Sequence, residues 1–158
     1  MTTSRRPSSF TIRRATAGDY EDLMALWTVS GSDLELHGRE SRPAFLRQLQ
    51  RFPDLYLVAA ESERIVGVVL GTHDGRKGWI NRLAVHPDCR RRGIAAALVT
   101  ACDTAIRGHG IGIVTALVES ENTASAALFE ALGYRADVPV RCFRKVDHPG
   151  AWLEPRKD

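Results

Sequence analysis

Two kinds of apolar pattern alternate along the chain, and the first kind predicts strands. Residues 55–60 (LYLVAA) and 65–70 (IVGVVL) are continuous apolar runs with the length of buried strands, and the polar residues between them predict a tight turn. Residues 79–85 (WINRLAV) follow the turn-like sequence HDGRKG and predict a third strand of this kind. Shorter segments predict three further strands, at 10–13, 113–118 and 138–146.

The second kind of pattern has the period of a helix. Apolar or sulfur-bearing residues step by four from Ile94 to Ile106, which predicts a helix over 93–108. Another apolar face predicts a helix over 19–31, with Asp19 as its N-cap. Further helices are predicted at 42–52 and at 122–132.

The order of these elements predicts an α/β fold. The strand at 79–85, the helix that follows it and the strand at 113–118 form a strand–helix–strand unit, whose two strands pair in parallel. Because the hairpin at 55–70 is antiparallel, the sheet is mixed, and about four helices flank it. Residues 1–9 are expected to form a flexible arm, and the rest of the 158-residue chain, 10–158, a single domain.

Composition and charge exclude several classes of protein. The chain is 44% hydrophobic and 26% charged, and no apolar run approaches the ~20 residues that a membrane-spanning helix needs. The N-terminus lacks the apolar core of a secretion signal, and the three scattered cysteines suit a reducing compartment, so we expect a cytoplasmic protein without a membrane partner. The five histidines have no metal-ligand spacing, so no metal is expected.

The loop at 86–93 (HPDCRRRG) predicts an anion-binding site. It leads from a strand directly into a helix, whose first N–H groups are unpaired and carry the positive end of the helix dipole. Arg90, Arg91 and Arg92 add positive charge, and Gly93 and Ala95 leave the backbone open to a phosphate. A solvated basic loop is the alternative. A nucleic-acid site is disfavoured, because no aromatic side chains lie between the arginines.

Two motifs resemble those of the GNAT superfamily of acyl-CoA-dependent N-acyltransferases. LAVHP at 83–87, followed by Arg90-x-x-Gly93-x-Ala95, is similar to the family's pyrophosphate-binding motif. The segment from Asn122 to Tyr134 is similar to the family's helix that runs from an asparagine to a Gly-aromatic pair, and FTIRRATAGDYEDLMALW resembles its usual start. The resemblance covers about residues 10–146. Within it, the segment GTHDGRKGWINRLAVHP is similar to a group of small bacterial members of the family. The resemblance implies a sheet whose strands splay apart at its centre.

The resemblance also implies a site for acetyl-CoA as co-substrate. The backbone of one strand would bind the pantetheine arm like an added strand, and the arginine loop and helix start would bind the pyrophosphate. The residues expected to bind the co-substrate are Leu83, Ala84, Val85, Arg90, Arg91, Arg92, Gly93, Ile94, Ala95, Ala96, Asn122, Ser125 and Phe129. A primary amine would attack the thioester directly in a ternary complex, and a backbone N–H near Leu83 or Val85 would stabilise the oxyanion.

The positions that carry the acid and the base in many family members differ here. The tyrosine that protonates the leaving thiolate is replaced by Phe129, and the glutamate that acts as base by Leu117. The candidate substitutes are Glu119, Asn81 and Ser125. Glu119 could take the amine proton through water, Asn81 could face the acceptor, and Ser125 could contact the CoA sulfur or the pantetheine arm. The same departures favour an alternative function, a non-catalytic acyl-CoA-binding sensor or interaction module.

The acceptor amine is expected to bind at the polar segment 31–40, between the first two helices. Asp33, Glu35 and Glu40 are the candidate residues to attract it. Small-molecule amines and the amines of proteins both stay open as acceptors. An exposed edge strand near the C-terminus could pair two copies of the chain into a homodimer.

Overall fold

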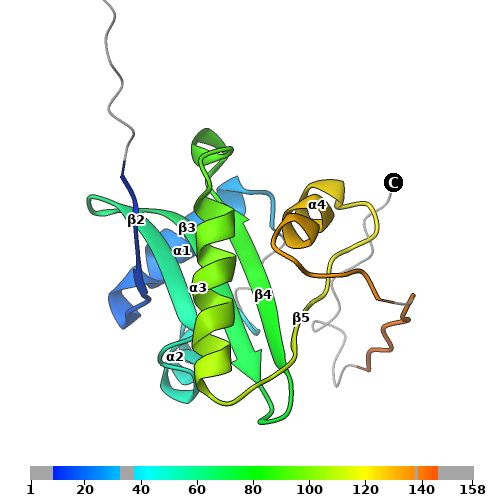
Figure 1. Cartoon of the computed structure of the whole chain (residues 1–158). Helices are drawn as coiled ribbons and strands as arrows, with labels where there is room; N and C mark the ends of the chain where they lie inside the picture. The colour runs from blue at the N-terminus through cyan, green and yellow to red at the C-terminus, as the bar shows by residue number, and fades with distance from the viewer. Residues whose placement is uncertain (1–8, 33–37, 138, 146–158) are drawn as a thin grey trace, which may run out of the picture.

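Five strands form one mixed sheet in the order β1-β2-β3-β4-β5 (Figure 1). The strands are β1 (Thr11–Arg14), β2 (Tyr56–Glu61), β3 (Arg64–His73), β4 (Gly78–Val85) and β5 (Val114–Ala116). Neighbours from β1 to β4 pair antiparallel and β5 runs parallel to β4, so the predicted α/β fold with a mixed sheet is confirmed. The structure is a computed structural model that describes residues 9–32, 38–137 and 139–145.

Helices cover both faces of this sheet. α3 (Ile94–Gly108) crosses one face, in front in Figure 1, while α1 (Tyr20–Val29) and α2 (Arg42–Arg51) pack on the face behind it. α4 (Thr123–Ala131) follows β5 and lies near β4 and β5 in the same view. The four predicted helices are therefore confirmed, and two short 3₁₀ turns precede α1 and α3, at Ala17–Asp19 and Pro87–Cys89.

α3 lies tightly on the sheet because its apolar face meets a position without a side chain. Ile94, Leu98 and Ile106 are fully buried, which confirms the helical face predicted from their spacing. Gly78 of β4 lies against Ile106, where any Cβ atom would overlap the isoleucine side chain. Glycine at this position lets the last turn of α3 approach the start of β4.

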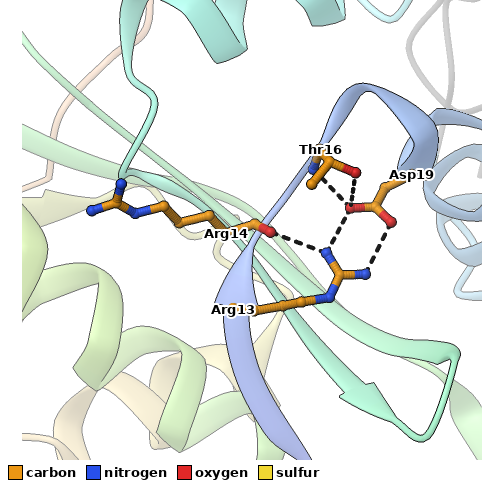
Figure 2. A network of polar contacts seen from close by, with 4 residues as sticks. All are labelled: Arg13, Arg14, Thr16 and Asp19. Carbon is orange, nitrogen blue, oxygen red and sulfur yellow. Dashed lines mark hydrogen bonds and ion pairs between the residues drawn. The ribbon is translucent and has the colours of Figure 1, made fainter.

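A single carboxylate holds the connection from β1 to α1 (Figure 2). Arg13 donates hydrogen bonds of 2.8 and 3.0 Å to Asp19, and the backbone N–H and the hydroxyl of Thr16 donate to it at 2.8 and 3.2 Å. The sequence predicted Asp19 as the N-cap of α1, but its side chain makes no cap hydrogen bond there. Asp19 is therefore the N-cap residue of α1, as predicted, but its carboxylate bonds to Arg13 and to Thr16 in the turn before the helix instead of to the first helical N–H groups.

The strand predicted at 138–146 does not form in the part of it that the structure describes. Residues 139–145 have no regular secondary structure, and residues 138 and 146 lie outside the described part of the chain. Pro139 has no N–H group for a ladder, and Val140 and Phe143 are 73% and 90% exposed rather than packed on a core. In the described residues β5 is thus the last strand, and it is shorter than the predicted 113–118.

Two expectations from the sequence are not tested by this fold. All but the last residue of the predicted arm, 1–9, lies outside the described ranges, and the single domain over 10–158 stays a prediction. No helix within the described ranges is both long enough and apolar enough to cross a membrane.

Candidate active site

β4 and β5 diverge after three residue pairs. Their pairing ends at Ile80 and Ala116, although β4 continues to Val85, which confirms the predicted central splay. A cavity of about 1060 Å³ opens here, and residues 80–85 and 116–119 line it. Beyond Ile80, this edge of β4 has no strand partner among the described residues, so an extended ligand could pair with it.

β4 carries a bulge beside the cavity. Two residue steps on β3, from Val68 to Leu70, face three steps on β4, from Ala84 to Asn81. Arg82, at the bulge, adopts a left-handed φ of 53°, which only a minority of non-glycine residues adopt. A bulge redirects side chains, and here the Arg82 guanidinium lies over the Trp27 ring of α1, 4.8 Å from its centroid.

The arginine loop forms the wall of the cavity at the start of α3. Arg91 and Gly93 both have left-handed φ values, of 61° and 77°, and α3 begins directly after them at Ile94. Gly93 is the N-cap of α3 and has no side chain that could accept from the first helical N–H groups. These amides and the arginines next to them concentrate positive potential, which suits a pyrophosphate.

The three arginines of this loop differ in their contacts. Arg90 and Arg91 line the cavity. Arg92 forms an ion pair with Glu61 at the end of β2 and is not among the lining residues. Two of the three arginines therefore line the cavity, and the third ties the loop to the sheet.

α4 supplies another part of the cavity wall. Asn122 caps this helix, since its side-chain oxygen accepts from the backbone N–H of Ser125 at 3.1 Å, and both residues line the cavity. Phe129 also lines it and packs edge-on against Tyr134, with ring centroids 5.2 Å apart. The Tyr134 hydroxyl donates to Asp103 of α3 at 2.7 Å, and burial together with this carboxylate raises the pKa of Tyr134. Tyr134 is thus placed to anchor α4 rather than to donate a proton into the cavity.

The three candidate catalytic residues all line the cavity, on different elements. Glu119 follows β5, Asn81 lies on β4, and Ser125 lies in the first turn of α4. The Asn81 amide donates to the Thr72 hydroxyl of β3 at 3.3 Å, so part of its hydrogen-bonding capacity is used within the sheet. Leu117, at the position of the family's glutamate, is 70% exposed and supplies no titratable group.

The candidate acceptor residues are placed differently from one another. Asp33 and Glu35 lie outside the described residues. Glu40 is 7% exposed and forms ion pairs with Arg39 at 3.1 Å and with Arg82 at 3.3 Å. It does not line the cavity, so in this structure its carboxylate holds two arginines instead of facing a ligand.

Most of the residues expected to bind acetyl-CoA meet at this one cavity. Those that line it are Leu83, Ala84, Val85, Arg90, Arg91, Gly93, Ile94, Ala95, Ala96, Asn122, Ser125 and Phe129. The sequence analysis missed three arginines on its walls, at positions 39, 82 and 144. Only Arg82, a charged residue inside an apolar strand, carried a signal that could have found it. In the described part of the chain, no three histidine, cysteine or acidic side chains are grouped to hold a metal.

Comparison with known sequences points to one family. The sequence profile described as the Acetyltransferase (GNAT) family matches residues 20–134. A curated acetyltransferase of Sodalis glossinidius is 34% identical over 116 residues, which are 73% of this chain and 80% of that protein. A curated acetyltransferase of Pectobacterium atrosepticum is 35% identical over 116 residues, 73% of this chain and 81% of that protein.

Solved structures share the fold. The PaiA N-acetyltransferase of Thermoplasma acidophilum, solved with coenzyme A, has a TM-score of 0.71 at 19% identity, over 82% of this chain and 91% of that one. The AAC(6')-Iy structure with a bisubstrate analogue, CoA-S-monomethyl-acetylneamine, has a TM-score of 0.72 at 20% identity, over 88% of this chain and 99% of that one. At these identities the likeness establishes the arrangement of the elements alone.

Proposed function

The chain belongs to the GNAT acetyltransferase family, and from that premise we propose that it transfers the acetyl group of acetyl-CoA to a primary amine. One observation carries the proposal: the cavity beside β4 and β5 is lined both by the glycine-capped start of α3 and by Arg90 and Arg91 directly before it. Such a site suits a pyrophosphate, and the unpaired edge of β4 suits the amide-bearing arm of a coenzyme. The coenzyme A and bisubstrate ligands of the two structural relatives support the same donor.

In this proposal the acetyl thioester lies between the diverging strands. The amine nitrogen attacks the carbonyl carbon in a ternary complex, and a backbone N–H near Leu83 or Val85 donates to the developing oxyanion. The carbon–sulfur bond then breaks, the thiolate of CoA leaves, and the amide product keeps the acetyl group. Glu119 takes the proton of the attacking nitrogen through water, while Asn81 and Ser125 contact the reacting groups.

Positioning supplies most of the proposed rate acceleration. Phe129 has no proton to give, so the thiolate leaves unassisted or takes a proton from water. Holding the amine next to the thioester replaces an encounter in solution, which lowers the barrier by several kcal/mol, on the order of 7 or more in well-oriented systems. No strong general base is then required, provided that the amine arrives neutral.

A second candidate function is a sensor that binds acyl-CoA without turnover. Phe129 and the exposed Leu117 favour it, because neither can act as acid or base. The experiment that separates the two is release of free CoA thiol from acetyl-CoA in the presence of a broad amine panel. Enzyme-dependent release together with the acetylated amine, seen by mass spectrometry, supports the transferase. Binding of acetyl-CoA without release on any amine supports the sensor.

Three further parts of the proposal rest on the sequence alone. They are a cytoplasmic location, a single domain over 10–158, and an acceptor that is either a small molecule or a protein amine. The described sheet has two edge strands, β1 and β5, and the proposed homodimer would pair at β5, the one later in the chain.

A further inference from the structure

The arginine loop, residues 86–93, has a backbone conformation that needs support from outside the loop. Arg91 and Gly93 have left-handed φ values of 61° and 77°, and Arg92 lies between them. A left-handed conformation costs free energy at a residue other than glycine and persists only where the surrounding structure holds it. The N–H groups that suit a pyrophosphate belong to this stretch, so a contact that holds Arg92 also holds their direction.

The end of the β2–β3 hairpin contacts the arginine loop where that loop begins. One residue step on β2 faces two steps on β3, from Gly67 to Ile65, so Val66 is the extra residue of a β-bulge. The carbonyl oxygen of Val66 accepts a hydrogen bond of 2.8 Å from the backbone N–H of His86. The bulge therefore fixes the point at which β4 leads into the loop.

The same end of the hairpin also contacts the first turns of α3. Gly67 packs against Ile94, the first residue of α3, and against Leu98. A Cβ atom at Gly67 would lie 2.9 Å from both side chains, which is closer than real Cβ contacts come. The start of α3 is therefore seated directly on β3, immediately after the arginine loop.

An ion pair holds the loop between these two contacts. Glu61, the last residue of β2, pairs with Arg92, and the two side chains are 21% and 28% exposed. Neither of these described residues lines the cavity, whereas Arg91 and Gly93 on either side of Arg92 do. Glu61 can therefore act on the donor site only indirectly, through the conformation of the loop and through its charge.

From these contacts we propose that Glu61 is a positioning residue for the donor. Its carboxylate holds Arg92 and so keeps the backbone of residues 91–94 in the conformation that presents N–H groups to the pyrophosphate. This inference rests on the proposed function, because it concerns the site of the same donor.

The two effects of Glu61 on the donor have opposite signs. Its negative charge acts through space against the phosphates of acetyl-CoA and opposes binding. Its contact with Arg92 favours binding, because it preorganises the loop. In this proposal the second effect is the larger one, which makes the sign of the change in affinity diagnostic.

The experiment compares Glu61→Gln with Glu63→Gln by calorimetric titration with acetyl-CoA. Both substitutions remove one negative charge from the same hairpin end, and Glu63 is exposed in its turn. Glu61→Gln should weaken binding about three- to fivefold, and Glu63→Gln should leave it unchanged or slightly tighter. Equal or tighter binding in Glu61→Gln, or an equal loss in both variants, would overturn the proposal.

A double-mutant cycle tests whether the effect passes through Arg92. In the background of Arg92→Gln, Glu61→Gln should cause no further loss of affinity, and the cycle isolates this coupling whatever else either side chain contacts. A loss of the same size in both backgrounds would refute positioning through Arg92. In steady-state assays, KM for acetyl-CoA should rise in Glu61→Gln while kcat stays within about twofold, a split that a general loss of folded protein would not produce.

The affinity of the parent separates this proposal from the proposed function. If the parent binds acetyl-CoA and Glu61→Gln binds it equally well, the donor site stands and the role of Glu61 is refuted. If the parent does not bind acetyl-CoA, the proposed function fails, and amide hydrogen exchange without ligand tests the loop alone. Faster exchange at residues 90–94 in Glu61→Gln than in Glu63→Gln then supports the role of Glu61 in holding the loop, and equal exchange overturns it.

Discussion

Trp27 and Arg82 contact each other twice, through different atoms. The Arg82 guanidinium lies 4.8 Å from the centroid of the indole ring, and the indole N–H of Trp27 points to the Arg82 carbonyl oxygen at 3.5 Å. α1 is thereby joined both to the backbone of the β4 bulge and to the side chain that the bulge redirects. This pair connects the packing of the α1 face with the shape of the proposed acceptor site.

Substituting Trp27 should therefore weaken binding of the acceptor more than binding of acetyl-CoA. Trp27→Phe keeps an aromatic ring but loses the indole N–H and part of the buried surface, which should lower the free energy of unfolding by about 1–2 kcal/mol. The KM for the acceptor should rise, while the affinity for acetyl-CoA stays as in the parent. Trp79→Phe, half-buried near the start of β4, is the control and should leave both constants unchanged. If Trp27→Phe lost affinity for acetyl-CoA while Trp79→Phe kept it, the assignment of Trp27 to the acceptor end of the site would be contradicted.

Gly93 offers a test of the helix start with a closely matched control. Gly93 and Gly110 have φ values of 77° and 79°, and at neither would a Cβ meet any atom within 4 Å. Alanine at either position should cost about 1 kcal/mol of folding stability, from the left-handed backbone alone. Only Gly93→Ala should weaken acetyl-CoA binding, because only Gly93 lines the cavity. Equal affinities in the two variants, measured by titration calorimetry, would speak against a phosphate at the start of α3.

Phe129→Tyr asks whether protonation of the thiolate limits the rate. A thiol is acidic, with a pKa near 8.5 in the case of cysteine, so its thiolate leaves without an acid. We expect kcat to change by less than about threefold, although a working general acid is commonly worth 10²-fold or more. A rise on the order of tenfold or more in steady-state assays would show that the natural protein lacks an acid that it needs.

Protonation of the Asp19 carboxylate at low pH should lower the stability of the fold. The hydrogen bond from Arg13, together with those from Thr16, holds the pKa of this carboxyl below its usual range. The folded-state pKa is lowered, so the stabilisation is fully present above the unfolded value of about 3.9 and is lost as the pH falls through the folded value. Asp19→Asn should cost about 1–2 kcal/mol at pH 7, and urea unfolding should show this difference shrinking toward pH 3.

Asp22→Asn is the control for that experiment. Asp22 is exposed in the first turn of α1, so its substitution should cost about 0.5 kcal/mol or less at pH 7. A difference between parent and Asp19→Asn that persists unchanged at pH 3 would contradict the assignment of the effect to the ionised carboxylate.

Features that depend on residues close together in the sequence could be predicted from the sequence. The four-residue spacing from Ile94 to Ile106 follows from the helical period, and the structure buries that face. The glycine before the helix marked the start of α3. The meeting of Arg90 and Asn122 at one cavity followed from the family resemblance and not from any local signal.

Features that depend on distant pairing were not predictable. The β4 bulge at Arg82 exists only in register with β3, and the burial of Glu40 requires Arg39, Arg82 and the packing of α1 beneath them. Likewise, Arg92 looked equivalent to its neighbours until Glu61 at the end of β2 was placed beside it. A polar residue in a sequence has no fixed partner, and its role changes when the fold supplies one.

The most direct test of the account is a calorimetric titration of the protein with acetyl-CoA, with desulfo-CoA and ATP as comparison ligands, repeated with Arg90→Ala. The account predicts micromolar binding of both CoA species, much weaker binding of ATP, and about tenfold weaker acetyl-CoA binding in Arg90→Ala. No binding of acetyl-CoA, or an unchanged affinity in Arg90→Ala, would contradict the claim that the start of α3 and its arginines hold the donor.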